Sequence, residues 1–331
     1  MRGGGLGPGR EFDLIRRFLE GSADPGPEVI IGPGDDCALI RVDQLAISTD
    51  LAIEDVHFRR DWLTPEEIGY RATAAALSDL AATAARPIGV LVSLALADPE
   101  VEGEGVRVME GVREAVEGVS GTILGGDLVR TTGPLTIDIV ALGSAPDPVL
   151  RSGAEPGDEV WVTGYLGGAA TAVESWLEGR EPDDDARAAY ARPEPRIREA
   201  LWLGARGAMT ALLDISDGIA GDLRHLATAS GVGILVEPDL IPIHEAALRR
   251  PEPLRRALEG GEDYELALTM PPGVGEELAP EFTAEFGVSL HRIGRVIPVD
   301  DEVRTGSVVA RRVDGRLAPL EVGGFEHFHQ G

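Results

Sequence analysis

Six aspartates of this sequence lie inside apolar segments or at their tips, where a carboxylate is costly to place. They occur in the stretches GDDCAL, ISTDLAI, ALSDLAA, ILGGD and LLDISDG, and they are Asp36, Asp50, Asp79, Asp127, Asp214 and Asp217. Burying one charge costs several kcal/mol unless the charge is paired or bound to a metal ion. Only Asp127 has an arginine close by in the sequence, Arg130. This pattern favours a cation that comes from outside the chain.

Oxygen donors beside these aspartates indicate which cation that would be. Ser48, Thr49 and Ser216 flank the acids. Hard divalent ions such as Mg²⁺ take oxygen ligands and often bridge carboxylates to substrate phosphates. Zinc is disfavoured, because the six histidines are scattered and the chain has one cysteine. The sequence therefore predicts a site for several Mg²⁺ ions.

Each aspartate taken alone also has a simpler interpretation. An aspartate at the tip of a strand is often a turn or cap residue, and Asp214 could cap the helix that follows it. Asp79 fits that interpretation least, because it lies well inside an alanine-rich helix. The number of such acids, more than any one of them, favours the metal site.

Glycines and two isolated basic residues accompany the acids. We expect the strand GTILGGD to end in a glycine turn that lets a ligand approach the backbone. The stretch TGYLGG follows a strand and opens a helix, so its amides could receive a phosphate or simply begin the helix. Arg151 could hold a phosphate or form a salt bridge, and His57 could contact substrate or lie on the surface. Metal ions together with phosphates indicate phosphoryl transfer, in which the protein mainly positions groups and neutralises charge.

The composition narrows the class of protein. The 331 residues include 57 acidic and 30 basic side chains, for a net charge of −27, and no lysine is present. A P-loop lysine and a Schiff-base lysine are therefore excluded. Nucleic acid is disfavoured as a partner, because a phosphate backbone needs a cationic surface. The single cysteine, Cys37, predicts a cytoplasmic protein, and no apolar run approaches the roughly 20 residues that span a bilayer.

The elements that must position these side chains mix helices and strands. After a flexible tail, residues 1–10, we expect a first domain over residues 11–148. Its predicted helices are EFDLIRRFL, the stretch 64–86 and the stretch 99–118; its predicted strands are EVIIG, CALIRV, QLAISTD, IGVLVSLAL, GTILGGD and PLTIDIVALG. Thr64 and Glu67 form a capping box for the second helix, and Pro87 is expected to end it.

A stretch rich in proline and glycine, at 146–158, is the predicted boundary to a second domain over residues 149–331. It begins with the strand EVWVTG and a helix from about 169 to 177, followed by a polar connection, EPDDDARAAYARPEPR. A strand end then runs into a helix that Gly231 closes. Further strands are VGILVEP, YELALTM, VSLHRIGRVI and GSVVARRV. The expected fold class is α+β in two domains rather than one doubly wound sheet.

The motifs, taken in order, resemble a known family. GPGDDCAL, AISTDLAIEDVHF, ALSDLAA, LGGD, RSGAEPGDEVWVTG, DISDG, GGEDYELALT and GGFEHF follow the order seen in thiamine-monophosphate kinases, over nearly the whole chain. That family belongs to the aminoimidazole ribonucleotide synthetase-like superfamily. The resemblance implies an N-terminal domain that binds ATP and Mg²⁺ and dimerises through a shared β-barrel, and a C-terminal α+β domain. It also implies direct in-line phosphoryl transfer from ATP to thiamine monophosphate in a homodimer.

The resemblance assigns roles residue by residue. It implies metal ligands at Asp36, Ser48, Thr49, Asp50, Asp79, Asp127, Asp214 and Asp217. It implies nucleotide contacts at Gly126, Asp127, Arg151 and Ser216, and contacts on the thiamine side at His57, Glu262 and Phe325. The ring of Phe325 would suit an aromatic cation or could anchor the C-terminal segment. Glu262 could balance that charge or be an acid of a turn.

Two departures and two alternatives accompany the resemblance. Ala76 stands where the family often has asparagine, and Leu128 where it often has threonine. One alternative is another ATP-dependent synthetase of the superfamily, of the selenophosphate or aminoimidazole ribonucleotide type; the selenophosphate enzyme would need a reactive cysteine and a lysine near the N-terminus. The other is a non-catalytic nucleotide-binding protein, which the loss of site acids would favour, but all of them are present.

Overall fold

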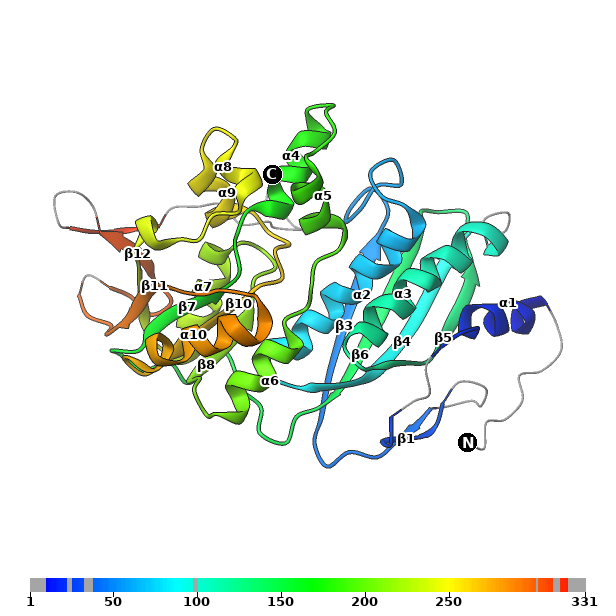
Figure 1. The fold of residues 1–331 in the computed structure, drawn as a ribbon, viewed down its shortest axis with the longest axis horizontal. Coiled ribbons are helices and arrows are strands. Elements are labelled where there is room, and N and C mark those ends of the chain that lie inside the picture. The colour runs from blue at the N-terminus through cyan, green and yellow to red at the C-terminus, as the bar shows by residue number, and fades with distance from the viewer. Residues whose placement is uncertain are drawn as a thin grey trace. The chain divides into compact units, whose positions relative to one another are not determined.

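The computed structural model describes residues 10–22, 26–32, 38–97, 101–301, 303–311 and 316–320. The chain divides into two compact units. Unit 1 comprises Met1–Leu80 and Ala85–Pro146, and unit 2 comprises Ala81–Ala84 and Asp147–Gly331. Each unit combines helices with one principal sheet, which confirms the α+β class expected from the sequence (Figure 1).

Unit 1 is built on a four-stranded sheet in the order β3-β6-β4-β5. The strands are β3 (Leu45–Ile53), β4 (Arg86–Leu96), β5 (Thr122–Arg130) and β6 (Thr136–Ser144). Neighbouring strands are antiparallel except β4 and β5, which run parallel. Two short strands, β1 (Val29–Ile31) and β2 (Leu39–Ile40), pair separately. Each of these strands overlaps a segment that the alternation of apolar residues predicts, although β3, β4, β5 and β6 each extend one to three residues beyond it.

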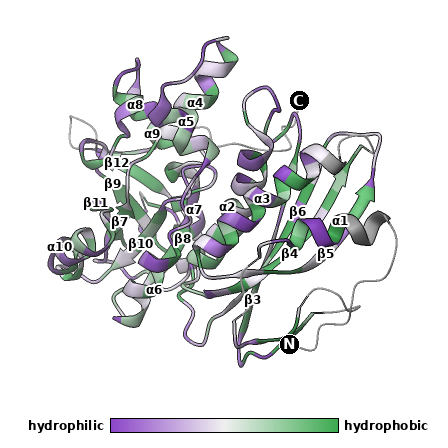
Figure 2. Ribbon diagram, turned by 45° about the vertical axis from the view of Figure 1, so that its right-hand side comes forward, coloured by the Kyte–Doolittle hydropathy of each residue, from purple (hydrophilic) through white to green (hydrophobic). Residues whose placement is uncertain are grey.

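Two helices, α2 (Pro65–Ala81) and α3 (Val106–Gly118), lie side by side over one face of this sheet (Figure 1). A Cβ atom at Gly69 would lie 1.9 Å from the carbonyl oxygen of Val108, and one at Gly111 would lie 1.8 Å from that of Glu66. The two helix backbones therefore touch, which only glycine permits. The strands that they cover are largely hydrophobic (Figure 2). A third helix, α1 (Arg10–Leu19), and a π-helical turn at Val101–Gly105 complete the described helices of unit 1.

The start of α2 is as predicted and its end is not. The Glu67 carboxylate accepts a hydrogen bond from the Thr64 amide at 2.8 Å, and the Thr64 hydroxyl accepts one from the Glu67 amide at 3.3 Å, which confirms the capping box. The helix ends at Ala81, several residues before Pro87. The chain leaves the helix through Ala84, whose φ is +52°. The prediction that Pro87 ends the helix is therefore wrong.

The predicted glycine turn at the end of GTILGGD is also wrong, because β5 continues through both glycines to Arg130. The pairing with β4 shifts by one residue at Leu124 and then runs on regularly. A Cβ atom at Gly126 would lie 1.9 Å from the carbonyl oxygen of Val92. The glycine therefore permits a close approach of two strands beside a bulge, which is a common reason for glycine in a strand.

Unit 2 is built on a seven-stranded sheet in the order β13-β12-β9-β11-β7-β10-β8. Its pairs are antiparallel except β9 with β12. The strands are β7 (Glu159–Thr163), β8 (Ala211–Asp214), β9 (Gly233–Val236), β10 (Leu266–Met270), β11 (Leu290–Ile297), β12 (Val308–Arg311) and β13 (Leu317–Pro319). Leu223 and Leu226 of helix α7 (Ile219–Ser230) pack into the core that these strands form.

The other helices of unit 2 are α4 (Gly168–Leu177), α5 (Asp184–Ala191), α6 (Ile197–Ala205), α8 (Glu245–Leu248), α9 (Pro253–Glu259) and α10 (Val274–Phe286), with a 3₁₀ turn at Pro238–Leu240. Helix α5 corrects the prediction of a purely polar connection after residue 180. Its Tyr190 is buried and packs edge-on against Trp176 of α4, with ring centroids 5.4 Å apart. Three consecutive aspartates and three nearby prolines hid this short helix in the sequence.

None of the helices among the residues that the structure describes is both long and apolar enough to cross a membrane.

Candidate active site

Ser48 and Asp79 of unit 1 come together although 31 residues separate them in the sequence. Asp50 and Ser48 lie opposite Ile139 and Ala141 in the β3–β6 register. Since Ile139 and Ala141 are buried, this side of β3 is the side that the helices cover. There the Ser48 hydroxyl donates a hydrogen bond to the carboxylate of Asp79 on α2. The structure thus gathers Ser48, Asp50 and Asp79 on one face of the sheet.

Thr49 and Asp127 belong to the opposite face of the same sheet. The Thr49 hydroxyl donates a hydrogen bond to the carboxylate of Asp138 on β6 at 2.9 Å. Ser93 of β4 lies opposite Asp127 on one side and Asp138 on the other, so the three side chains follow one another across the strands. The predicted ligands of unit 1 are therefore divided between two faces.

Asp138 is not among the ligands predicted from the sequence. It stands between Ile137 and Ile139 in an apolar strand, so the criterion that selected the other aspartates would have selected it too.

His57 follows β3 in unit 1. Its Nδ1 atom accepts a hydrogen bond from the Ile53 amide at 3.1 Å. In the neutral imidazole this places the proton on Nε2, so that Nε2 is the donor. The side chain is half-buried. Its ring is therefore oriented by the backbone of the preceding strand.

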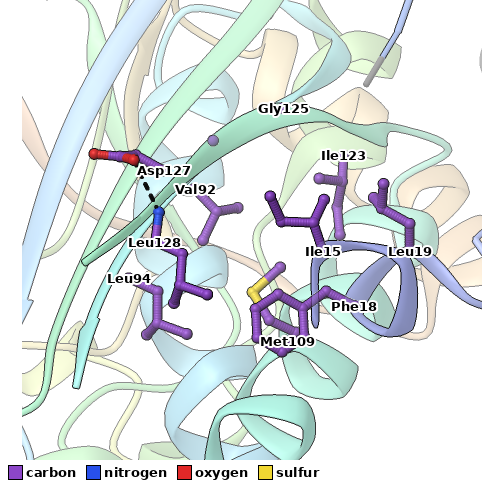
Figure 3. Close-up of a pocket in the computed structure, with 11 residues that line it drawn as sticks. Ile15, Phe18, Leu19, Val92, Leu94, Met109, Ile123, Gly125, Asp127 and Leu128 are labelled. Carbon is purple, nitrogen blue, oxygen red and sulfur yellow. Dashed lines mark hydrogen bonds between the residues drawn. The ribbon is translucent and has the colours of Figure 1, made fainter. Parts of the chain in front are cut away.

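A small apolar cavity of about 70 Å³ lies beside the glycines of β5. Figure 3 shows Ile15 and Phe18 of α1 facing Met109 of α3, with Val92 and Leu94 of β4 to their left. Asp127 points away from these apolar side chains, and its carboxylate accepts a hydrogen bond from the Leu128 amide at 3.0 Å (Figure 3). Gly125 and Gly126 line this cavity, at the backbone where the sequence led us to expect the approach of a ligand.

In unit 2, Asp214 ends β8, and the loop between β8 and α7 holds Ser216 and Asp217. The carboxylate of Asp222, in the first turn of α7, accepts hydrogen bonds from the amides of Ser216 and Asp217, both at 3.2 Å. Burial, and then the negative charges of Asp214 and Asp217, raise the pKa of Asp222 to about 8. The cap residue of α7 is Gly218, with φ +106° and no side-chain cap. The simpler interpretation of Asp214 as the helix cap is therefore wrong.

Glu262 lies against the same loop. Its amide donates a hydrogen bond to the carbonyl oxygen of Ser216 at 2.7 Å, and its φ is +69°. A Cβ atom at the neighbouring Gly261 would lie 2.5 Å from that same oxygen. The two backbones are therefore in direct contact, and the segment that carries Glu262 rests on the loop that carries Ser216.

The glycines of TGYLGG begin helix α4. Gly167 is its cap residue, with φ +87°. The Gly167 amide donates a hydrogen bond to the carboxylate of Asp263 at 2.8 Å. The amides of Gly168 and Ala169 also form hydrogen bonds with this carboxylate, and burial outweighs all three and raises the pKa of Asp263 to about 8. A carboxylate of the chain itself thus occupies the position that a phosphate would need.

Arg151 lies away from Ser216. The Ser230 hydroxyl, at the C-terminal end of α7, donates a hydrogen bond to the carbonyl oxygen of Arg151 at 3.2 Å. Ser216 precedes the N-terminal end of the same helix, which has 12 residues and is therefore about 18 Å long. Within unit 2, the structure separates these two predicted nucleotide contacts by the length of α7.

The remaining predicted residues, Asp36 and Phe325, lie outside the described residues, as does Cys37. Among the residues that are described, no three His, Cys, Asp or Glu side chains are placed to hold a metal ion together. The donors still fit Mg²⁺, which is commonly bound by one or two carboxylates together with waters and substrate phosphates. Ser48, Asp50 and Asp79 offer this kind of oxygen set in unit 1, and Asp214 and Asp217 offer it in unit 2.

Comparisons with known proteins agree on the family. Residues 34–145 match the N-terminal domain, and residues 155–306 the C-terminal domain, of AIR synthase related proteins. A thiamine-monophosphate kinase of Rhodopirellula baltica is 36% identical over 85% of this chain and 87% of its own length.

Solved structures lead to the same family. The thiamine-monophosphate kinase of Stenotrophomonas maltophilia K279a superposes with a TM-score of 0.79 at 30% identity, over 95% of this chain and 98% of that one. The structure described as AaThiL complexed with AMPPCP and TMP gives a TM-score of 0.75 at 29% identity, over 96% of both chains. The chain belongs to the thiamine-monophosphate kinase family of AIR synthase related proteins.

Proposed function

We propose that this protein phosphorylates thiamine monophosphate to thiamine diphosphate, with ATP as the phosphate donor. One observation carries the proposal: the fold matches, over 96% of both chains, a kinase of the same family that was solved with AMPPCP and TMP. AMPPCP is an ATP analogue, and TMP in a thiamine-monophosphate kinase is the phosphate acceptor. Direct in-line transfer between these two substrates requires no covalent intermediate on the protein.

Mg²⁺ is the proposed cofactor, in several copies per site. Bound Mg²⁺ would neutralise the charge on the transferred and bridging phosphate oxygens. The proposed ligands are the metal-site residues of the sequence analysis: Asp36, Ser48, Thr49, Asp50, Asp79, Asp127, Asp214 and Asp217. The Ser48–Asp79 hydrogen bond supports the assignment, because it keeps two oxygen donors of different elements together.

The nucleotide is assigned to Gly126, Asp127, Arg151 and Ser216. The apolar cavity beside Gly126 supports this assignment, because an adenine ring needs an apolar slot next to open backbone. Asp127, Arg151 and Ser216 lie in separate parts of the chain, so the assignment can be tested at each of them independently. If it is correct, substitution at each of them raises the KM for ATP.

The thiamine side is assigned to His57, Glu262 and Phe325. The Nε2 donor of His57 suits a phosphate oxygen or a ring nitrogen. The carboxylate of Glu262 and the ring of Phe325 suit the cationic thiazolium ring. These three residues are proposed to set the KM for thiamine monophosphate.

A homodimer is proposed on the open face of the sheet of unit 1. Leu45, Ile47, Leu51 and Val129 are 37%, 62%, 45% and 49% exposed on β3 and β5. Alternating apolar residues on an exposed sheet face mark an interaction surface, and a barrel shared with a second copy would bury them. Ile47→Asp should therefore shift the sedimentation coefficient from dimer to monomer; an unchanged dimer would contradict this use of the face.

The function is tested by incubating the purified chain with ATP, Mg²⁺ and thiamine monophosphate and following thiamine diphosphate. Product that depends on both substrates and disappears with EDTA is the expected result. Absence of product, with ATP consumed only when another acceptor is added, would contradict the proposal and favour another synthetase of the superfamily. ATP binding without turnover would favour a non-catalytic protein.

A cytoplasmic location is proposed as well, because the sequence contains a single cysteine.

A further inference from the structure

The segment 260–265 of unit 2 adopts a backbone that its sequence does not favour. Glu262 and Tyr264 have φ values of +69° and +50°. Residues with side chains rarely adopt this left-handed region, and when they do the surroundings must hold them there. Two such residues flank Asp263, so the question is which contacts keep the segment in place.

Backbone hydrogen bonds to the β8–α7 loop supply part of the answer. The Glu262 amide donates to the carbonyl oxygen of Ser216 at 2.7 Å, and the Tyr264 amide donates to that of Ile215 at 2.9 Å. The segment therefore rests on the loop that carries the proposed nucleotide contact Ser216. These hydrogen bonds alone do not fix the segment 260–265. The β8–α7 loop is held separately by the carboxylate of Asp222, so the loop could keep its position while the segment 260–265 moved.

Side-chain anchors supply the rest. The carboxylate of Asp263 accepts hydrogen bonds from the amides that begin α4, with the Gly167 amide at 2.8 Å. Two residues on, the buried Glu265 accepts hydrogen bonds from Arg196 at 2.8 and 2.6 Å and from the Thr163 hydroxyl at 2.6 Å. Both anchors use the stretch TGYLGG, which lies about 100 residues earlier in the chain.

The glycines of TGYLGG fit this arrangement closely. A Cβ atom at Gly164 would lie 2.0 Å from a carboxylate oxygen of Glu265, and Gly167 has φ +87°. Glycine at position 164 makes room for the carboxylate of Glu265, and glycine at position 167 permits the backbone conformation in which its amide meets Asp263. The two motifs are thus complementary parts of one structure, and neither presents an open phosphate cradle.

We infer that Asp263 is a positioning residue for thiamine monophosphate: by accepting hydrogen bonds from the start of α4, it holds Glu262 in the conformation that meets the substrate. The inference rests on the proposed function of Glu262. Asp263 acts as a hydrogen-bond acceptor, so asparagine, which retains an acceptor oxygen and suits a helix cap, replaces it. Ser216 stays in place without Asp263, because Asp222 holds its amide separately.

The test is the steady-state kinetics of Asp263→Ala and Asp263→Asn with both substrates varied. Asp263→Ala should raise the KM for thiamine monophosphate about tenfold or more, since small displacements of a binding group have effects of this size. The KM for ATP should stay within about threefold of the wild-type value, and Asp263→Asn should restore both. A wild-type KM in Asp263→Ala, or an Asp263→Asn protein that is folded and equally impaired, would overturn the inference.

A matched control and a second readout separate positioning from general stability. Asp158 accepts hydrogen bonds from the Glu155 amide at 2.9 Å and from the Thr210 hydroxyl at 2.7 Å, outside the segment. Asp158→Ala should lower thermal stability and leave the KM for thiamine monophosphate unchanged. If Asp263→Ala does not fold, Asp263→Ser, whose shorter side chain reaches the amides poorly, must still raise that KM about threefold or more.

Hydrogen–deuterium exchange keeps this inference distinct from the proposed function. The amides of Glu262 and Tyr264 should exchange faster in Asp263→Ala than in the wild type and in Asp263→Asn. A wild-type protein that makes no thiamine diphosphate would overturn the proposed function and the kinetic part of the inference with it. Unchanged exchange at both amides would overturn the positioning itself, whatever the activity.

Discussion

Units 1 and 2 hold their candidate side chains in different ways. In unit 1, Ser48, Asp50 and Asp79 stand on a strand and a helix, and the periodicity of those elements decides which way each side chain points. In unit 2, Ser216, Asp217 and Glu262 stand on loops, and their backbone amides donate hydrogen bonds to carboxylate and carbonyl oxygens that hold them in place. A site on regular elements depends on packing, whereas a site on loops depends on a few identifiable bonds.

The largest expected effect tests the site on regular elements. Asp79→Asn should lower kcat about 10³-fold, because an amide lacks the negative charge with which Asp79 is proposed to bind Mg²⁺. The expected loss is several kcal/mol of transition-state stabilisation. The fold should persist, since asparagine still accepts the hydrogen bond from Ser48. Turnover and thermal unfolding are to be measured together.

The matched control for that substitution is Glu110→Gln, at an exposed acid on α3 of the same unit. It should change neither turnover nor stability by a measurable amount. Normal turnover in Asp79→Asn would mean that the Asp79 carboxylate is structural. The difference between the two units would then concern folding and not catalysis.

The next effect tests the site on loops. Asp222→Ala removes the acceptor of the Ser216 and Asp217 amides. It should lower kcat/KM for ATP about 10- to 100-fold and lower the free energy of unfolding by about 1–3 kcal/mol. Denaturant titration and initial rates at varied ATP measure both. A loss of stability with normal kcat/KM would show that the geometry of this loop does not limit catalysis.

A smaller effect concerns pH, and its sign follows from burial. Burial raises the pKa of Asp263 to about 8, with the charge of Glu265 acting in the same direction. Between about pH 4 and pH 8 the folded chain keeps a proton that the unfolded chain has lost, so this group lowers the free energy of unfolding as the pH rises. Asp263→Asn should remove up to about 1 kcal/mol per pH unit of that decline. Denaturant midpoints at pH 5, 6 and 7 measure the difference, and equal slopes in both proteins would contradict it.

The smallest effect, at Gly221, belongs to a comparison between helices of the two units. No heavy atom lies within 4 Å of a Cβ atom built at Gly221 of α7, so Gly221→Ala should raise the free energy of unfolding by about 0.5 kcal/mol. Gly69→Ala in α2 should lower it by about 1–3 kcal/mol, because of the contact with Val108. Denaturant unfolding of both variants measures these changes. If both substitutions change the free energy of unfolding in the same direction, the helix contact at Gly69 can adjust to a methyl group without loss of stability.

Features of this structure that depend on neighbouring residues could be predicted from the sequence, and features that depend on long-range pairing could not. Apolar alternation indicated β3, β4 and β6, and local side-chain chemistry indicated the capping box of Thr64 and Glu67, because both signals lie within a few residues. The face on which Asp127 lies depends on the bulge at Leu124 and on pairing with β4, which the local pattern does not contain. The partnership of Asp263 with Gly167 joins residues 96 positions apart, and no local rule connects them.

The family resemblance assigned roles that the local sequence pattern alone did not. It selected candidate ligands and substrate contacts, but it did not reveal that Asp138 accompanies Thr49 or that Asp222 holds Ser216. Asp138 and Asp222 act through hydrogen bonds to neighbouring residues, and a motif defined by the ligands alone does not include them.

The pairing of TGYLGG with the segment 260–265 also bears on how the chain folds. Thr163–Glu265 and Gly167–Asp263 are contacts between residues 102 and 96 positions apart, and such contacts form slowly because a long loop must close first. On the ribosome, β7 and the start of α4 emerge well before β10, so α4 waits without its carboxylate partner while about 100 further residues are made. The conformation of Glu262 is therefore set among the last steps of folding, and a chain stopped before that point would be compact in part but would lack the contacts that hold this residue.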